Sequence, residues 1–580
     1  MKPVLGIDLG TTNCAMARGD GARGEEGIEL LPIAQLVNPG EIQSPTLLPS
    51  FVFLPGSADF PAGSTALPWD DSPATVVGTL AAKRGAENAG RLVSSAKSWL
   101  SHAGVDRNSA LLPSTAPEGV ARISPVEASR AYLAHLKDSS ELDFAAHQVL
   151  VTVPASFDAV ARDLTLKAAT EAGYRDVILL EEPQAAFYAW LERHADWRER
   201  IGPNDRVLVI DVGGGTTDFT LIAVHDAQGA LTLERLAVGE HILLGGDNMD
   251  LALARFLEQR LPKLDPVQFQ SLWQQCRAAK EALLSNDGPN EQPVTLLGRG
   301  SSLIGGSIKG QLTRAEVREL LLNGFFPQVA STDLPERAKR SGLQAMGLPY
   351  TADAAITRHL AQFLRSVKRG ELTAPTHVLF NGGVFRAPAL RERVLAVLNQ
   401  WLTAEGAPPV RPLEGEDLMH AVARGAAFYG VMRQTPGGIR IRGGVPRTYY
   451  IGIEESLPAV PFMKPPLKVL TVVPFGMEEG TTHRFASREF GLVVGEPAEF
   501  RFFVSSTRRE DAAGELLERV TDELAELPAM EVTLPANAGD AGVIAATLES
   551  TVTETGLLQL WIVARDGRRW KLEFNVRERA

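Results

Sequence analysis

The chain has 580 residues, of which 44% are hydrophobic and 22% charged, a composition typical of a folded protein with two to four domains. Its net charge of −12 leaves no basic excess, so we expect no nucleic-acid partner. The two cysteines, Cys14 and Cys276, exclude a disulfide framework and fit a reducing compartment. Asp8 falls where a signal peptide needs its apolar core, and no apolar run reaches membrane-spanning length. The sequence therefore predicts a cytoplasmic protein without a membrane partner.

The first predicted element is a strand and glycine turn at 4–13, VLGIDLGTTN, and its pattern returns at 207–218 as VLVIDVGGGTTD. In each copy an apolar run ends in an aspartate, Asp8 or Asp211, and glycine leads into a threonine pair. Glycine lets backbone N–H groups approach an anion, and a strand-end aspartate suits a hydrated divalent metal. A single copy would be explained equally well as a tight hairpin, but two copies are improbable by coincidence.

Neither copy is a P-loop or a Rossmann turn, because no GxxxxGK[ST] follows a strand and no GxGxxG opens a helix. The repeated hairpin resembles the actin-like ATPase superfamily, in which two related lobes offer phosphate-binding hairpins to one nucleotide. The resemblance implies an α/β fold of two lobes with a duplicated ribonuclease-H-like core. It also implies that backbone N–H groups hold the phosphates. The residues given this role are Gly10, Thr11, Thr12, Asn13, Gly213, Gly214, Gly215 and Thr216.

Loops and edge strands are predicted from 19 to 71, where glycine, proline and serine are frequent. Helical periodicity returns between Thr79 and His102 and carries Lys97 in SSAKSWL. A lone lysine on a helix is usually solvated. Lys97 nevertheless matches an Ala-Lys pair of the heat-shock chaperones, in which the ammonium reaches the γ-phosphate and the attacking water. The resemblance therefore implies a catalytic role for Lys97.

Two strand–helix units follow, beginning with VLVTVPASFD at 149–158 and with DVILLEEPQAA at 176–186. Asp158 can cap the first of these helices, and Gly173 can end it. VTVPASF and EEPQAA resemble fingerprints of the seventy-kilodalton heat-shock chaperone (DnaK-like) family. The resemblance covers nearly the whole chain, although it is vague in the last 130 or so residues.

Family resemblance gives three further residues a role. Pro154 and Arg162 would form the switch that couples nucleotide state to the second domain. Glu182 would join Asp8 and Asp211 around the water shell of the metal. Without the resemblance, Glu182 is explained as an acid favoured by the helix dipole.

The segment GEHILLGGDNMDLALARFL resembles the family's next phosphate-side loop, with Gly245 and Gly246 in the turn. A helix predicted from Pro266 to Ser285 has one apolar stripe and a second face that, in the family, holds the adenosine. The residues on this second face are Arg277, Lys280, Glu281 and Leu284. Arg277 replaces a family glutamate, and Glu281 replaces an arginine of many members. We therefore expect weaker nucleotide binding and poorer base selectivity.

The segment 376–395, THVLFNGGVFRAPALRERVL, is predicted as strand, Gly-Gly turn and helix. It resembles the family's adenosine motif. Gly382 and Gly383 would let the base lie against the backbone, and Arg386 would stack on the adenine. Between 286 and 375 the resemblance is weaker, and no function is predicted for that segment.

A helix at 419–433 is expected to end an ATPase domain at 1–433, followed by a linker at 434–447 in which Arg440 and Arg442 reverse the family's acidic charge. From 448 to 580 the alternating strands predict a β-sandwich that resembles the chaperones' substrate domain. Phe485, Phe500 and Phe502 would line its peptide groove, although a place in the core is about twice as probable on burial frequencies. No helical segment follows the last hairpin, so we expect the family's helical lid to be absent.

The sequence is interpreted as an ATP-dependent chaperone that slowly hydrolyses ATP to ADP with Mg²⁺, and with K⁺ as a further cation. Asp8, Glu182 and Asp211 would organise the hydrated metal, while Lys97, Thr216 and Asp218 would orient the water and coordinate counter-cations. The implied partners are unfolded polypeptides, a J-domain co-chaperone and a nucleotide exchange factor. Two alternatives stay open. One is a nucleotide-holding co-chaperone or scaffold without an active cycle, and the less favoured one is a sugar kinase.

Overall fold

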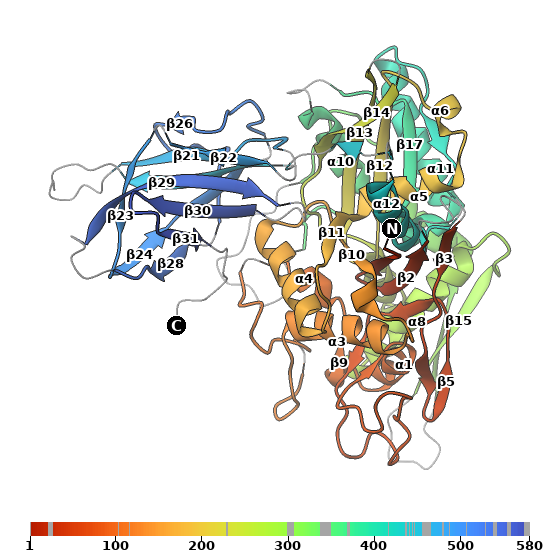
Figure 1. The fold of residues 1–580 in the computed structure, drawn as a ribbon. Coiled ribbons are helices and arrows are strands. Elements are labelled where there is room, and N and C mark those ends of the chain that lie inside the picture. Colours follow the sequence, from red (N-terminus) through yellow and green to blue (C-terminus); the bar gives the residue numbers. More distant parts are fainter. Residues whose placement is uncertain are drawn as a thin grey trace. The chain divides into compact units, whose positions relative to one another are not determined.

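A computed structural model gives the structure of the chain and describes most of its residues (Figure 1). Not described are residues 1, 21–26, 103, 115, 228–229, 298–306, 337–347, 349, 368–371, 416, 436–437, 440, 443–444, 446, 455–465, 478–480, 487, 506, 528, 537–541, 554–557 and 573–580. The chain forms two compact units. The first is Met1–His102, Arg107–Ser156 and Thr165–Arg440, and the second is Ala103–Asp106, Phe157–Leu164 and Ile441–Ala580.

The first lobe of unit 1 is built on a mixed sheet with the strand order β11-β10-β1-β2-β3. β1 is parallel to β10, which is parallel to β11, and on its other side β1 is antiparallel to β2. The apolar run of β1 is buried on both faces, as expected for a strand at the centre of a sheet covered by helices. The strands are β1 (Val4–Leu9), β2 (Asn13–Gly19), β3 (Ile28–Leu30), β10 (Gln148–Val153) and β11 (Ile178–Glu181), and β6 (Leu47–Pro49) also pairs with β2.

The second lobe repeats this topology with the order β18-β17-β12-β13-β14. β12 is parallel to β17, which is parallel to β18, and β12 and β14 are both antiparallel to β13. The repeated hairpins predicted from the sequence are thus β1–β2 and β12–β13, in equivalent places of two equivalent sheets. The strands are β12 (Arg206–Val212), β13 (Thr217–Ala227), β14 (Ala230–Val238), β17 (His377–Asn381) and β18 (Arg411–Leu413).

Helices flank both sheets, and several begin with a side-chain cap. Ser124, Asp265 and Thr313 each accept a backbone N–H of the first turn, which stabilises the helix start. The first lobe has α3 (Pro125–Asp138), α5 (Glu182–Arg193), α6 (Trp197–Arg200), α12 (Ala421–Gln434) and residues 165–171 of α4 (Ala159–Glu171), whose start is assigned to unit 2. The second has α7 (Gly246–Glu258), α8 (Pro266–Leu284), α9 (Arg314–Gly324), α10 (Ile356–Ser366) and α11 (Pro388–Ala404). Within the described ranges, no helix combines the length and apolar character needed to cross a membrane.

The last helix of unit 1, α12, returns to the first lobe and packs on β1, β2, β10 and α5. Glycines make this close packing possible. A Cβ on Gly6 of β1 would lie 2.4 Å from the carbonyl oxygen of Ala423, and one on Gly425 would lie 1.7 Å from that of Ala185. Because these neighbours are backbone atoms, no larger residue fits at either position.

The outer part of the first lobe differs from the prediction of one helical stretch from Thr79 to His102. α1 (Thr79–Glu87) ends early, a short strand β9 (Leu92–Val93) pairs with β7 (Val52–Phe53), and α2 (Ala96–Trp99) is a single turn. The helix breaks because Gly85, Asn88 and Gly90 weaken it and because Ser95 adopts a left-handed conformation with φ of 53°. The other strands here are β4 (Gln35–Asn38), β5 (Glu41–Gln43) and β8 (Val76–Val77).

The outer part of the second lobe consists of α7, α8, α9 and a hairpin of β15 (Glu291–Leu297) and β16 (Ser307–Thr313). The apolar stripe predicted on α8 is buried at Leu272, Cys276, Ala279 and Leu283. The weakly matched segment 286–375 therefore contains a regular hairpin and two helices, α9 and α10, in its described parts.

Unit 2 consists of antiparallel sheets. One has the order β26-β21-β20-β25-β27, another joins β22, β23, β29, β30 and β31, and β24 pairs with β28. Tyr450, Val469, Phe503 and Leu524 form a buried apolar cluster, and Ser550 of β29 donates to the carbonyl oxygen of Val472 on β21 at 2.6 Å. The strands are β20 (Thr448–Glu454), β21 (Leu467–Val473), β22 (Thr482–Arg484), β23 (Phe490–Val493), β24 (Pro497–Phe500), β25 (Phe502–Ser505), β26 (Leu516–Leu517), β27 (Ala525–Glu526), β28 (Met530–Thr533), β29 (Val543–Val552), β30 (Leu558–Ala564) and β31 (Arg569–Leu572).

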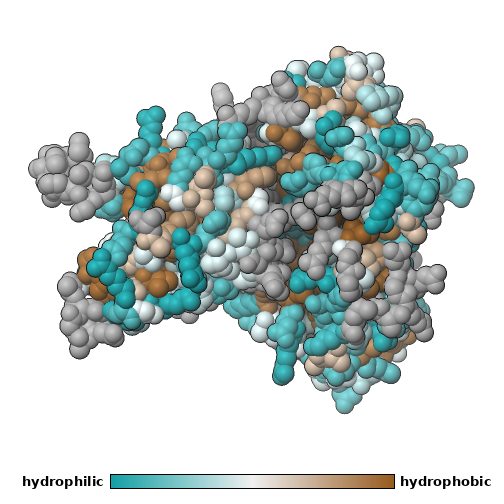
Figure 2. Space-filling view, turned by 45° about the horizontal axis from the view of Figure 1, so that its top comes forward, coloured by the Kyte–Doolittle hydropathy of each residue, from teal (hydrophilic) through white to brown (hydrophobic). Residues whose placement is uncertain are grey.

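On the face shown in Figure 2, hydrophilic side chains are frequent on both units and apolar residues form separate patches. The exposed large apolar side chains of the described chain are far apart in sequence: Ile42, Leu334, Tyr350, Val520 and Val543. Scattered apolar residues of this kind are normal on a protein surface.

Candidate nucleotide site

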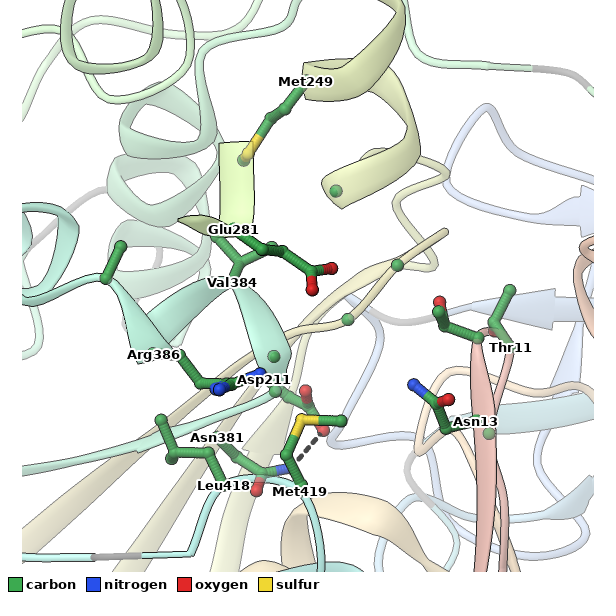
Figure 3. A pocket seen from close by; sticks show the side chains of 18 of the residues that line it. Thr11, Asn13, Asp211, Met249, Glu281, Asn381, Val384, Arg386, Leu418 and Met419 are labelled. Carbon is green, nitrogen blue, oxygen red and sulfur yellow. Dashed lines mark hydrogen bonds between the residues drawn. The ribbon is translucent and has the colours of Figure 1, made fainter. Parts of the chain in front are cut away.

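A cavity of about 540 Å³ lies between the two lobes of unit 1, and both repeated hairpins line it (Figure 3). The first lobe contributes Asp8, Gly10, Thr11, Thr12, Asn13 and Glu182, and the second contributes Asp211, Gly213, Gly214, Thr216, Gly246, Arg277, Lys280, Glu281, Leu284, Gly382, Gly383 and Arg386. Eighteen of the residues singled out from the sequence therefore meet at one cavity. Four others that were predicted for the nucleotide site do not line it, namely Lys97, Asp218, Gly215 and Gly245.

The hairpins approach each other so closely that only glycine fits at the contact. A Cβ on Gly214 would lie 1.7 Å from Oγ1 of Thr12 in the opposite lobe. The Thr12 hydroxyl is buried and has no hydrogen-bond partner within the described structure. A buried hydroxyl without a partner is unfavourable unless a ligand satisfies it. Thr12 and Gly214 thus form a narrow polar cradle that a phosphate oxygen can complete.

The second lobe closes the cradle from another side at Gly382. This residue has φ of 88°, and a Cβ there would lie 2.3 Å from the carbonyl oxygen of Val212 and 2.7 Å from Asp211 Oδ1. A left-handed glycine therefore lets the end of β17 lie directly beside the end of β12.

Three of the carboxylates that line the cavity belong to the central sheets and to the start of α5: Asp8 from β1, Asp211 from β12 and Glu182 from α5. The pKa of both Asp8 and Asp211 is raised to about 7. Burial is the main cause, and the nearby charge of Glu182 is the second. Thr152 donates to Asp8 Oδ1 at 3.2 Å, and Asn381 donates to Asp211 Oδ2 at 2.7 Å. Crowded carboxylates in a buried site are the setting that a bound cation relieves.

Direct metal coordination is not what this geometry offers. Among the residues that the structure describes, no three His, Cys, Asp or Glu side chains are close enough to ligate one ion. Carboxylates spaced around a cavity instead suit a cation that keeps its water shell, as Mg²⁺ prefers to do. The donor set is oxygen-only and includes the unpartnered acceptor Asn381 Oδ1, so the residues present fit a hydrated Mg²⁺ ion.

Lys97 is buried in the one-turn helix α2, with 4% of its side chain exposed, rather than solvated. Its ammonium forms an ion pair with Glu182. Burial disfavours the charged form, but the carboxylates of Glu182 and Asp8 outweigh it and raise the pKa of Lys97. Lys97 therefore remains charged. It does not line the cavity itself, but its ion-pair partner Glu182 does.

Asp218 lies in a buried chain of hydrogen bonds that joins the two lobes. Ser156 donates to Asp218 Oδ1, and Ser156 Oγ lies 2.6 Å from Nδ1 of His241. His241 Nε2 lies 2.9 Å from Ser101 Oγ of the first lobe. Burial raises the pKa of Asp218 to about 7, while the bond from Ser156 lowers it. The orientation of the Asp218 side chain is thus fixed by the hydrogen bond from Ser156, outside the cavity.

The face of α8 predicted to hold adenosine does line the cavity. Acidic side chains of α7 form ion pairs with the cationic side chains of this face. Arg277 forms ion pairs with Asp247 and with Asp250, the latter at 2.9 Å, and Lys280 pairs with Asp250 at 2.6 Å. Burial opposes the charge of Arg277, but these two aspartates raise its pKa. In Figure 3 the carboxylate of Glu281 points into the cavity from α8, and Arg386 lies on the neighbouring wall.

The predicted switch and groove residues lie outside this cavity. Pro154 follows β10, and Arg162 is buried in α4 with its Nε donating to the Phe157 carbonyl oxygen at 3.2 Å. In unit 2, Phe485 and Phe502 are buried, which favours core packing, whereas Phe500 is half-buried. The linker residue Arg440 lies outside the described residues, and Arg442 belongs to the short strand β19 (Ile441–Arg442).

Sequence reasoning missed several lining residues. The polar ones include Asn381, Asp247 and Asp250, and the apolar ones include Leu47, Leu418, Met419 and Val422. Asn381 had a visible signal, because it is the only polar residue at the end of the apolar run VLFN before Gly382. The apolar group had none, since Leu47 and Met419 are distant in sequence and meet only in the folded lobe.

Comparisons with known proteins agree with this geometry. The family model described as Hsp70 protein matches residues 85–332. The chaperone protein HscA homolog of Pseudomonas putida is 31% identical over 329 residues, which is 55% of this chain and 42% of that protein. A heat shock protein homolog of Encephalitozoon cuniculi is 29% identical over 325 residues, or 53% of this chain and 44% of that protein. The chain thus spans less than half the length of these relatives. It is a divergent member of the Hsp70 family.

Proposed function

We propose that the chain is an ATP-dependent molecular chaperone of the DnaK-like type, with an actin-like ATPase domain at 1–433, a linker at 434–447 and a β-sandwich substrate domain at 448–580. One observation carries the proposal: the β1–β2 and β12–β13 hairpins of two equivalent sheets line a single cavity with Asp8, Glu182 and Asp211. ATP and ADP bind there with Mg²⁺, and a J-domain co-chaperone and an exchange factor set the pace of the cycle.

Binding of the phosphates is the task of the hairpins. The unpaired Thr12 hydroxyl donates to a phosphate oxygen, and the backbone N–H groups of Gly10 to Asn13 and Gly213 to Thr216 stabilise the phosphate charge. Asp8, Glu182 and Asp211 hold water molecules of the hydrated cation. Mg²⁺, when bound, neutralises the phosphate charge.

Hydrolysis then depends on positioning, because phosphoryl transfer requires mainly orientation and charge stabilisation. Lys97 exchanges its ion pair with Glu182 for the γ-phosphate and the attacking water. Thr216 and Asp218 orient that water, with Asp218 fixed by Ser156. K⁺ balances the remaining negative charge around Asp218. Because Lys97 must first leave a buried ion pair, turnover is slow.

The β domain binds unfolded polypeptide, and Pro154 with Arg162 conveys the nucleotide state to it. Phe500 is the groove residue that the structure favours most, because it alone of the three predicted phenylalanines is only half-buried. Phe485 and Phe502 support the groove from the core.

A second candidate is a co-chaperone or scaffold that holds nucleotide without an active cycle. It is favoured by one observation, that Lys97 and Asp218 do not line the cavity and are both engaged with other side chains. On this alternative the ion pair of Lys97 persists when nucleotide is bound.

Steady-state ATP turnover, measured with and without an unfolded polypeptide, separates these functions. We expect slow turnover that the polypeptide stimulates. Tight ATP binding without turnover would select the scaffold, and turnover only with an added sugar would select a kinase. Lys167→Ala is a suitable control for substitution of Lys97, because Lys167 is a first-lobe lysine that is about half exposed and lies outside the cavity.

A further inference from the structure

Asn381 is the last residue of β17 and lies directly opposite Asp211 in the parallel pairing of β17 with β12. Its side chain is buried, with 3% of the residue exposed, and it lines the cavity. Nδ2 donates to Asp211 Oδ2 at 2.7 Å, the contact marked by the dashed line in Figure 3. No family role assigned above includes this residue.

Hydrogen-bond accounting fixes the orientation of this amide. A bound cation keeps Asp211 ionised, and an ionised carboxylate only accepts hydrogen bonds, so the amide presents its NH₂ group to Asp211, as it does in the structure. Its carbonyl oxygen is then left over, and Oδ1 is buried without a partner in the described structure. A buried amide oxygen without a donor destabilises the protein by about 1–3 kcal/mol, which a suitable ligand recovers.

The equivalent contact in the first lobe is simpler. There Thr152, on β10, donates its hydroxyl to Asp8 at 3.2 Å. Each lobe thus provides a donor to the aspartate that ends its central strand. Only the second lobe adds a buried carbonyl oxygen beside that aspartate. The additional oxygen is an acceptor, so it attracts a cation or a water proton and repels a phosphate oxygen.

We propose that Asn381 is a positioning residue for the hydrated Mg²⁺ of the nucleotide complex. Its amide N–H holds the Asp211 carboxylate in place, and its Oδ1 accepts a proton from a water molecule of the cation. The inference rests on the proposed function, because it requires Mg²⁺-dependent nucleotide binding. Partners of this kind orient the groups that hold a metal, and their loss commonly weakens metal binding by about 10–100-fold.

The test measures ADP affinity by calorimetry over a series of Mg²⁺ concentrations, for the full chain and three variants. Asn381→Val removes both the donor and the oxygen. Asn381→Thr keeps a hydroxyl donor for Asp211, as Thr152 has for Asp8, but lacks the carbonyl oxygen. Thr220→Val is the matched control, because Thr220 is a fully buried residue of the same sheet whose Oγ1 has no partner in the described structure and which does not line the cavity.

We expect Asn381→Val to reduce the factor by which Mg²⁺ raises ADP affinity by about tenfold. Asn381→Thr should give an intermediate reduction, Thr220→Val should match the wild type, and ADP affinity without Mg²⁺ should change little in all three. Thermal unfolding with and without Mg²⁺-ADP gives a second readout and confirms that each variant is folded. If Asn381→Val does not fold, Asn381→Thr decides the matter alone.

The outcomes separate the inference from the function on which it rests. If Mg²⁺ does not raise the ADP affinity of the wild-type protein, the proposed function is overturned. Wild-type protein with a clear Mg²⁺ effect that Asn381→Val retains within twofold overturns the role of Asn381. Asn381→Thr that equals the wild type overturns the part assigned to Oδ1.

Discussion

In the first lobe, the cavity is lined by the β1–β2 hairpin and by Glu182 at the start of α5. In the second lobe, the β12–β13 hairpin has the same place, but α7, α8 and the turn after β17 add Arg277, Lys280, Glu281 and Arg386. The strand order and directions of the two sheets are the same. Duplication of the sheet therefore repeats the elements proposed to bind phosphate, whereas the residues proposed to recognise the base belong to the second lobe.

The comparison extends to the groups behind the hairpins. Lys97 of the first lobe is fixed by an ion pair with Glu182, and Asp218 of the second is fixed by Ser156 from the first. A buried ion pair between Glu181 and Arg235 also joins the lobes. The lobes thus share the charged groups that we propose for the chemical step, and damage to either lobe should affect that step.

The largest effect is expected from Lys97→Ala and Asp218→Ala, one residue from each lobe. Both variants should bind ATP but hydrolyse it about a hundredfold more slowly, because each loses a positioned charge. Single-turnover hydrolysis with binding measured separately checks this. If one variant keeps wild-type turnover, the chemical step belongs to the other lobe only.

A substitution at the contact between the lobes is expected to have the next largest effect. Gly214→Ala places a Cβ against Thr12 Oγ1, which should destabilise the contact between the hairpins by about 2 kcal/mol, as is typical of overpacking, and so weaken ADP binding. Adding Thr12→Ala should restore part of the loss, since it removes the clashing atom. Gly10→Ala is the comparison, because its clash is with the Asn13 carbonyl oxygen of its own turn. Rescue of Gly10→Ala by Thr12→Ala would contradict this account.

Buried histidines allow the acid stability of the lobes to be compared. His135 in the first lobe donates to the Ala34 carbonyl oxygen at 2.9 Å, and burial lowers its pKa to about 4. Between pH 6.5 and pH 4, His135 binds a proton in the unfolded chain but not in the folded chain. The free energy of unfolding therefore decreases as the pH is lowered through this range. His135→Gln should remove about 1 kcal/mol of this loss between pH 7 and pH 5.5.

His377 in the second lobe is the matched case. Burial lowers its pKa as well, but Asp205, 3.7 Å away, opposes this effect. His377→Gln should therefore relieve less of the acid sensitivity than His135→Gln. Urea unfolding at the two pH values gives the comparison, and equal effects would show that Asp205 does not compensate for burial.

The smallest effect concerns the base, for which the proposed contacts all come from the second lobe. A carboxylate only accepts hydrogen bonds, so Glu281 should favour guanine, whose N1–H and N2–H₂ are adjacent donors, more than adenine. ATP should therefore bind weakly for this family, and GTP should be discriminated poorly. Glu281→Gln should raise the ratio of ATP to GTP affinity by about threefold, the effect of one weakened hydrogen bond. Calorimetry with both nucleotides tests this, with Glu258→Gln on α7 as the control outside the cavity.

Local patterns predicted much of the fold. The two hairpins, the stripe of α8, the Asp158 contact at the start of α4 and the succession of strands from residue 448 follow from periodicity and turn residues. The break after α1 was missed because the apolar spacing of 79–102 continues through β9. The burial of Lys97 was also missed, since it depends on Glu182, which is 85 residues away.

The site was predictable where the family motifs reach it and not elsewhere. Motifs identified the hairpins and the α8 face, but they do not show that Arg277 is held by Asp247 and Asp250. Asn381 illustrates the limit. Its polar side chain stands out at the end of an apolar strand, but its meaning depends on the pairing with Asp211, which only the sheet register reveals.

The position of α12 bears on how the chain folds as it is synthesised. The second lobe is continuous from β12 to β18, whereas the first lobe needs α12 against Gly6 and α5 to be complete. A ribosome therefore releases every strand of the second sheet before the helix that covers β1. We expect the lobe that is made first to fold last. A nascent chain stalled so that residue 413 has left the ribosome while α12 is still inside it should hold a protease-resistant second lobe beside a first lobe that is still cleaved.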